Sequence, residues 1–121
     1  MSKRRVVVTG LGIISPVGNT ISSAWENIVS GKSGITRITR FDASNFTSQI
    51  AGEVKDFDIQ QYLSAKEARR MDIFIHYGMA AAIQAVRDAG IEDTSQLDPE
   101  RICVNIVSGI GGLPMIEHTD T

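Results

Sequence analysis

The sequence contains a single cysteine, Cys103, among its 121 residues. One thiol cannot form a disulfide within the chain, and an unpaired cysteine is typical of a reducing compartment rather than of a secreted protein. The apolar runs are also far shorter than the roughly 20 residues that a membrane-spanning helix requires. We therefore expect a cytoplasmic protein without disulfides and without membrane contact.

The sequence also lacks an excess of charge of either sign. Its 12 Lys and Arg residues and 14 Asp and Glu residues leave a formal net charge of -2. This balance gives no general attraction to nucleic acid or to an anionic membrane, so an anionic partner would need a local basic patch. With 42% hydrophobic and 21% charged residues, the composition is that of one soluble globular domain or of part of a larger one.

The N-terminus resembles a signal peptide only superficially. Basic residues at positions 3–5 precede an apolar run, but Gly10, Gly12 and Pro16 interrupt that run and no small-x-small cleavage site follows. Residues 6–9 are a continuous β-branched run, which is typical of a strand covered on both faces. We therefore predict a strand here, in a mostly parallel sheet between helices.

The pattern downstream predicts helices and further strands. A first helix is expected from Asn19 or Thr20 to Gly31, followed by a meandering connection over residues 32–48 and a short strand at 50–54. A long apolar helix, buried on most sides, is expected over residues 72–89 and ends at a glycine. Residues 101–107 nearly alternate and predict an interior strand. A glycine-rich turn at 108–112 and a helix that starts around Pro114 follow.

Cysteine and histidine are present, but their placement does not favour catalysis. Cys103 lies within the predicted strand among apolar neighbours, a setting that disfavours the reactive thiolate, so we predict a buried structural role. His76 and His118 have no identifiable partner, and no residues have the spacing of metal ligands. The sequence therefore predicts neither a cysteine–histidine pair nor a metal site.

Two glycines directly after the first strand suggest a nucleotide-binding loop. The dinucleotide-binding pattern, however, requires a third glycine where this chain has Ser15, and a P-loop requires a lysine where it has Asn19. We favour the interpretation that Gly10 and Gly12 let the backbone turn and pack closely. A nucleotide-binding domain is kept as an alternative.

A capping box at residues 64–67, Ser-Ala-Lys-Glu, predicts a helix that begins at Ala65. Lys66, Arg69 and Arg70 then fall on one side of it, at spacings of three and four residues. Cations at a helix N-terminus oppose the macrodipole, and together they attract an anion. The alternative interpretation is an ordinary solvated helix face.

Residues 6–20, Val-Val-Val-Thr-Gly-Leu-Gly-Ile-Ile-Ser-Pro-Val-Gly-Asn-Thr, resemble the opening of the β-ketoacyl-acyl-carrier-protein synthases. Stretches at 33–35, 71–78 and 108–113 resemble later segments of that family, in the same order. The resemblance implies a thiolase-like α/β fold with layers α-β-α-β-α, of which residues 1–121 form most of the first half. It also implies a decarboxylating condensation that elongates acyl chains with malonyl-acyl carrier protein, in a homodimer and without a cofactor.

The resemblance assigns binding residues but no catalytic residue. The family's nucleophilic cysteine and its two histidines are expected beyond Thr121, so this chain alone is predicted to be inactive. Gly109 and Ile110 match positions that line the acyl-chain pocket, and Ile110 favours the type II synthases over type I, which has glycine there. The three basic residues named above match positions that receive the acidic helix of acyl carrier protein.

Two readings of the family resemblance stay open. The chain is part of an active condensing enzyme, or it is part of a non-catalytic partner of the chain-length-factor type, which shares the fold and lacks the nucleophile. A synthase of type I is a further alternative. The residue at the nucleophile position downstream would decide between an enzyme and a partner.

Overall fold

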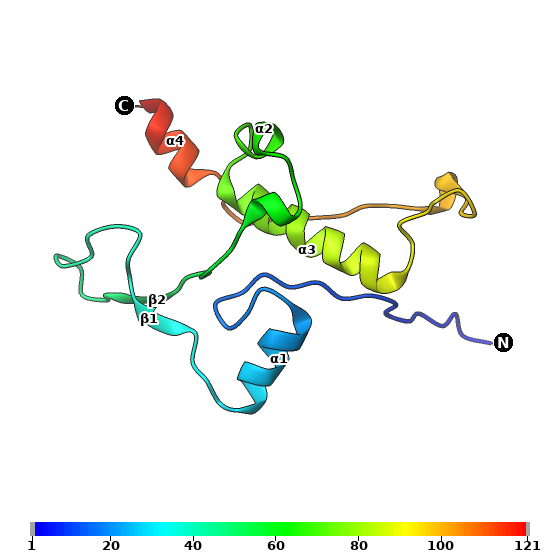
Figure 1. The fold of residues 1–121 in the computed structure, drawn as a ribbon, viewed down its shortest axis with the longest axis horizontal. Helices are drawn as coiled ribbons and strands as arrows, with labels where there is room; N and C mark the ends of the chain where they lie inside the picture. The colour runs from blue at the N-terminus through cyan, green and yellow to red at the C-terminus, as the bar shows by residue number, and fades with distance from the viewer. Residues whose placement is uncertain (1, 121) are drawn as a thin grey trace.

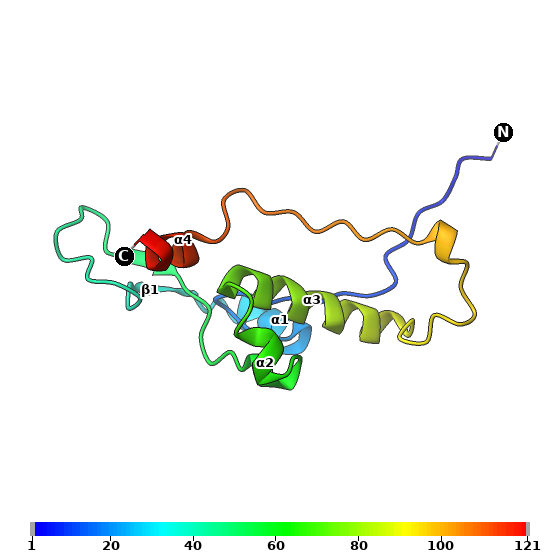
Figure 2. The ribbon, with the colours of Figure 1, turned by 90° about the horizontal axis from the view of Figure 1, so that it is seen from above.

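The structure, a computed structural model, describes residues 2–120. In chain order its elements are α1 (Ile21–Val29), β1 (Ile35–Arg37), β2 (Ile50–Gly52), the 3-10 helix η1 (Ile59–Gln61), α2 (Ala65–Ala68), α3 (Ile73–Ala89), the 3-10 helix η2 (Pro99–Arg101) and α4 (Leu113–Asp120). Helix α3 lies in the middle of the molecule (Figure 1). The segment between η2 and α4 runs back along α3 in an extended form (Figures 1 and 2).

The starts of α1 and α3 and the end of α3 lie within one residue of those predicted. Thr20 caps α1 and forms a capping box with Ser23. Asp72 caps α3, and Gly90 ends it in the left-handed conformation with φ of 71°, which a residue without a Cβ adopts at little cost. Pro114 lies in the first turn of α4, where its missing N–H is not needed.

Two predicted strands are not formed among residues 2–120. Residues 6–9 and 102–107 contain no strand, and Val6 and Val107 are 89% and 85% exposed. A strand needs a neighbour to pair its N–H and C=O groups, and none of the described segments provides one. The sheet that does form is a small antiparallel pair, in which Ile35 faces Gly52 and Arg37 faces Ile50. The predicted mostly parallel sheet is therefore not seen, and β1 was not predicted.

The core is small, and α3 is less buried than its composition predicts. Among the described residues of α3 only Ala80 is buried, while Phe74 and Val86 are each 38% exposed, so the prediction of burial on most sides is wrong. The other buried apolar residues are likewise alanines: Ala24, Ala43 and Ala68. The chain exposes 10072 Å². A compact monomer of 13.1 kDa would expose about 6,400 Å².

The N-terminal segment packs directly on the backbone of α3 at its two glycines. A Cβ at Gly12 would lie 1.9 Å from the carbonyl oxygen of Ala81, and one at Gly10 would lie 2.3 Å from that of Ala85. Only glycine permits so close an approach. The close-packing interpretation of Gly10 and Gly12 is confirmed, because α3 occupies the space that a side chain at either position would need.

Candidate functional site

Helix α2 begins at the predicted capping box. Ser64 Oγ accepts a hydrogen bond from the backbone N–H of Glu67 at 3.2 Å, and Glu67 Oε2 accepts from the backbone N–H of Ser64 at 3.1 Å and from its hydroxyl at 3.0 Å. The backbone hydrogen bond and then the hydroxyl lower the pKa of Glu67 below its ordinary value. The carboxylate of Glu67 is therefore ionised at neutral pH and is occupied at the helix start.

The three basic residues of α2 and its C-terminal end are all exposed: Lys66, Arg69 and Arg70. Among residues 2–120, none of them takes part in an ion pair. Lys66 and Arg70 border one open depression together with Ser64 and Glu67, whereas Arg69 does not line it. We call the three residues the basic face. Their charges are available to an anionic partner.

The position of the basic face relative to the helix dipole corrects one prediction. The helix begins at Ala65 as expected but ends at Ala68, so Arg69 is its C-terminal cap and Arg70 lies beyond it. At this end a cation complements the macrodipole rather than opposing it. Lys66 lies within the helix itself, which at four residues is little more than one turn long. The cost of placing three cations at a helix N-terminus, which the sequence predicted, does not arise.

The inner side of α2 is attached to the rest of the molecule. Ala68, the buried residue of the helix, is 8% exposed, and its carbonyl oxygen lies 2.7 Å from Nε2 of His76 in α3. No partner for His76 was identifiable from the sequence, and the structure supplies one in the carbonyl oxygen of Ala68. No sequence signal identifies such a contact, because it joins residues of two different helices.

A glutamine in α3 connects further segments around this region. Gln84 accepts from the backbone N–H of Ile13 at 3.0 Å and donates to the carbonyl oxygen of Asn19 at 2.7 Å and to the hydroxyl of Tyr62 at 2.8 Å. Tyr62 directly follows η1 and stacks on Phe57. The chain that leads into α2 is thus tied to α3 as well. Sequence reasoning did not single out Gln84.

The glycine-rich loop that carries Gly109 and Ile110 is exposed at its tip. Ile110 is 82% exposed, and a Cβ at Gly109 would have no atom within 4 Å. The end of the loop is fixed more firmly, because Gly111 lies against Phe74, where a Cβ would be 2.5 Å from the ring. Residues 2–120 therefore do not enclose an acyl pocket around these two residues.

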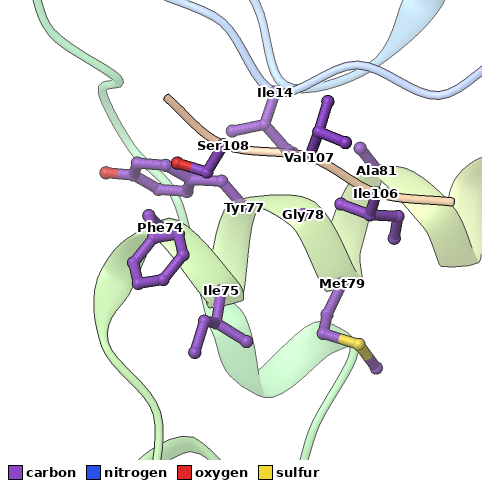
Figure 3. Close-up of a pocket in the computed structure, with 10 residues that line it drawn as sticks. All are labelled: Ile14, Phe74, Ile75, Tyr77, Gly78, Met79, Ala81, Ile106, Val107 and Ser108. Atoms are coloured by element: carbon purple, nitrogen blue, oxygen red, sulfur yellow. The ribbon is translucent and has the colours of Figure 1, made fainter. Parts of the chain in front are cut away.

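A cavity of about 520 Å³ lies between α3 and the extended segment before this loop. Ile106, Val107 and Ser108 border it on one side, and Phe74 and the turn around Gly78 border it on the other (Figure 3). The lining is mostly apolar. Gly109 and Ile110 do not line it, although Ser108 directly precedes them. The sequence did not predict this cavity.

The environment of Cys103 differs from the prediction. Its side chain is exposed, in the extended segment that follows η2. The prediction of a buried thiol is wrong here, because a strand residue is covered only where neighbouring strands or helices lie over it. His118 lies in α4, in a different part of the chain from Cys103. Within residues 2–120 no group of acidic, cysteine and histidine side chains could hold a metal ion, and no helix is both long and apolar enough to cross a membrane.

Comparisons with known proteins match this chain over nearly its whole length. Residues 3–120 match the model of the β-ketoacyl synthase N-terminal domain. The 3-oxoacyl-[acyl-carrier-protein] synthase 2 of Vibrio harveyi is 57% identical over 117 residues, which cover 97% of this chain and 28% of the relative. The same-named protein of Synechocystis sp. is 48% identical over 121 residues, 100% of this chain and 29% of the relative. The chain thus spans less than a third of the length of these relatives.

Solved structures give the same result. The ishigamide ketosynthase/chain length factor superposes with a TM-score of 0.69 at 37% identity, over 76% of this chain and 23% of that one. A type II polyketide ketosynthase, solved with its acyl carrier protein and bound to the hexaketide, gives a TM-score of 0.59 at 28% identity, over 78% of this chain and 24% of that one. The fold is therefore that of the thiolase-like ketosynthases, and the chain belongs to the β-ketoacyl synthase family, whose N-terminal domain it matches over residues 3–120.

Proposed function

We propose that the complete protein containing this chain is a condensing enzyme of type II that elongates acyl chains in fatty-acid synthesis. The observation that carries the proposal is the 57% identity to a 3-oxoacyl-[acyl-carrier-protein] synthase 2 over 97% of the chain. In this reaction an acyl group passes from acyl carrier protein to a cysteine thiolate. Malonyl-acyl carrier protein then loses CO₂, and the resulting carbanion attacks the thioester carbonyl, so that a carbon–carbon bond forms as the bond to the cysteine sulfur breaks and the thiolate leaves. The nucleophile is expected outside residues 1–121.

We infer that acyl carrier protein docks on the basic face. Lys66, Arg69 and Arg70 are exposed and have no ion-pair partner among residues 2–120, so binding an acidic helix would not require an existing pair to break. One structural neighbour is a ketosynthase in complex with its acyl carrier protein, which supports a carrier protein as the partner. Charges at the rim of an interface mainly steer association.

We further propose that Gly109 and Ile110 line the acyl-chain pocket of the complete enzyme. Their side of the loop is open, with no atom within 4 Å of a Cβ at Gly109 and with Ile110 82% exposed. An apolar side chain presented in this way is available to an acyl chain and to further pocket walls outside the described residues. We also propose that the complete enzyme supplies the remaining walls of this pocket and has the α-β-α-β-α layering.

The second candidate is a non-catalytic partner of the chain-length-factor type. It is favoured by one observation, the superposition on a ketosynthase/chain length factor at a TM-score of 0.69. A partner of this type has the same fold but carries no acyl group on a cysteine. The two candidates therefore differ in one covalent step.

Mass spectrometry of peptides, together with a product assay, separates the two candidates. The complete protein is incubated with acyl-acyl carrier protein, digested and searched for an acyl thioester, and CO₂ and β-ketoacyl product are then measured after malonyl-acyl carrier protein is added. We expect one acyl group on a cysteine other than Cys103, with CO₂ and product formed in equal amounts. Absence of both the acyl adduct and the product would rule out the condensing enzyme and favour the non-catalytic partner. The same chemistry carried out by the 121-residue chain alone would contradict the expected location of the nucleophile.

A further inference from the structure

Helix α2 is too short to maintain its conformation alone. It has four residues, whereas isolated helices shorter than about 12 residues are marginal in water. Its start is closed by the Ser64–Glu67 capping box. Two of the three residues of the basic face, Arg69 and Arg70, lie at the opposite end, so the capping box does not fix them directly.

The end of α2 is held by a side chain from another helix. His76, in the first turn of α3, places Nε2 2.7 Å from the carbonyl oxygen of Ala68. A carbonyl oxygen can only accept a hydrogen bond, so Nε2 carries the hydrogen. The same carbonyl also accepts from the backbone N–H of Met71 at 3.2 Å, which leads the chain from α2 into α3. His76 thus binds the last residue of α2 on its inner, buried side.

This hydrogen bond is not needed for α3 itself. Helix α3 has its own N-terminal cap in Asp72 and its own left-handed end at Gly90. The His76 side chain instead reaches back eight residues along the chain, to the residue that precedes Arg69. Its effect is therefore on the position of α2 and of the charges that follow it.

We propose that His76 is a positioning residue that holds the basic face in place for the acyl carrier protein. The inference rests on the docking function proposed above. With the end of α2 held, the backbone at Arg69 and Arg70 is ordered before the partner arrives, and less conformational entropy is lost on binding. Without it, the partner must order this end of α2 itself, which weakens binding.

The experiment uses three variants of the complete enzyme. His76→Phe keeps a ring and removes the donor, His76→Gln places an amide N–H close to the position of Nε2, and the double variant Lys66→Glu with Arg69→Glu tests the docking surface itself. For each, KM and kcat are measured with malonyl-acyl carrier protein and with a malonyl-pantetheine thioester. Hydrogen–deuterium exchange of residues 65–71 reports the order of α2 independently of any partner.

We expect His76→Phe to raise KM for the carrier-protein substrate about three- to tenfold, the effect of losing one hydrogen bond, and to leave KM and kcat for the pantetheine thioester unchanged. Amides at 69–71 should exchange faster while those in the second half of α3 do not. His76→Gln should restore both properties to within about twofold, because the amide N–H donates as the imidazole does.

The outcomes separate this inference from the docking proposal. If the charge-reversed variant keeps a wild-type KM, docking at the basic face is wrong and the role of His76 falls with it. If charge reversal raises KM but His76→Phe changes neither KM nor exchange, docking stands and the inference is overturned. It is also overturned if His76→Phe impairs both substrates equally, which indicates a general folding defect, or if glutamine does not rescue.

Discussion

Gly12 lies against the carbonyl oxygen of Ala81 so closely that a Cβ at residue 12 would be 1.9 Å away from it. Two hydrogen bonds beside Gly12 keep the N-terminal segment aligned with α3. The N–H of Leu11 donates to Asp88 at 2.9 Å, and that of Ile13 donates to Gln84 at 3.0 Å. The glycines therefore allow the backbone of this segment to contact that of α3, and the hydrogen bonds on either side of Gly12 stabilise the contact.

Replacing Gly12 by alanine should destabilise the complete protein by about 3 kcal/mol or more, because the obstacle is backbone of α3 and cannot rotate away as a side chain would. The unfolding midpoint in urea measures the loss. Gly78→Ala, within α3, is the matched control, since its Cβ would lie 3.7 Å from Ile106, an ordinary van der Waals contact, and we expect no loss of stability. Equal stability of the two variants would show that the N-terminal segment does not pack on α3.

Charge reversal at the basic face should weaken binding of acyl carrier protein. For Lys66→Glu with Arg69→Glu we expect an increase in KM of about tenfold at low salt, since exposed ion pairs contribute roughly 0.2 to 1 kcal/mol each. The effect should appear in the association rate and decrease as salt is raised. Stopped-flow binding at several salt concentrations checks it. Lys32→Glu with Arg37→Glu reverses the same number of charges elsewhere and should leave the rate near wild type.

Replacing Ile110 by phenylalanine in the complete enzyme should shorten the acyl chains that it accepts. The ring takes up volume that a long chain needs, and packed sites tolerate added volume poorly. Elongation rates with a series of acyl donors measure the change, with short donors as the internal control. Unchanged rates for short and long donors alike would show that Ile110 does not line the pocket.

The capping box should lose its contribution to stability in acid. Hydrogen bonds from Ser64 lower the folded-state pKa of Glu67 below its ordinary value of 4.5, so their stabilising effect is complete above pH 4.5 and is lost as the pH falls through the folded-state pKa. Carboxyl NMR titration should give a midpoint for Glu67 below 4.5. Ser64→Ala removes the hydroxyl and should move the midpoint upward in part, because the backbone N–H still donates. A midpoint insensitive to this substitution would show that the hydroxyl bond is not formed.

Sequence reasoning predicted the features that depend on neighbouring residues. Thr20, Ser64 and Gly90 each act within a few positions of themselves, and the helices begin or end there as expected. The positions of Gly109 and Ile110 in an exposed loop also follow from the glycines around them, but their role in a pocket was carried by the resemblance alone.

The features that depend on distant residues could not be predicted in the same way. A β-branched run such as residues 6–9 indicates strand preference, but the sheet also requires partners, and residues 2–120 supply none for it. Cys103 is exposed for the same reason. The contacts of Gly12 with Ala81 and of His76 with Ala68 join elements whose relative placement the sequence does not encode locally.

Both proposed sites depend on the first turn of α3. Asp72 uses one carboxylate oxygen for the N–H of Ile73 at 2.6 Å and the other for the N–H of Met115 in α4 at 3.1 Å. Phe74 contacts Gly111 in the glycine-rich loop, and His76 binds the end of α2. Asp72, Phe74 and His76 all lie within five consecutive residues, 72–76. The basic face and the loop that carries Gly109 and Ile110 are thus both held in place by residues 72–76. A carrier protein bound at the basic face and an acyl chain in the proposed pocket would therefore both contact elements that the same five residues hold.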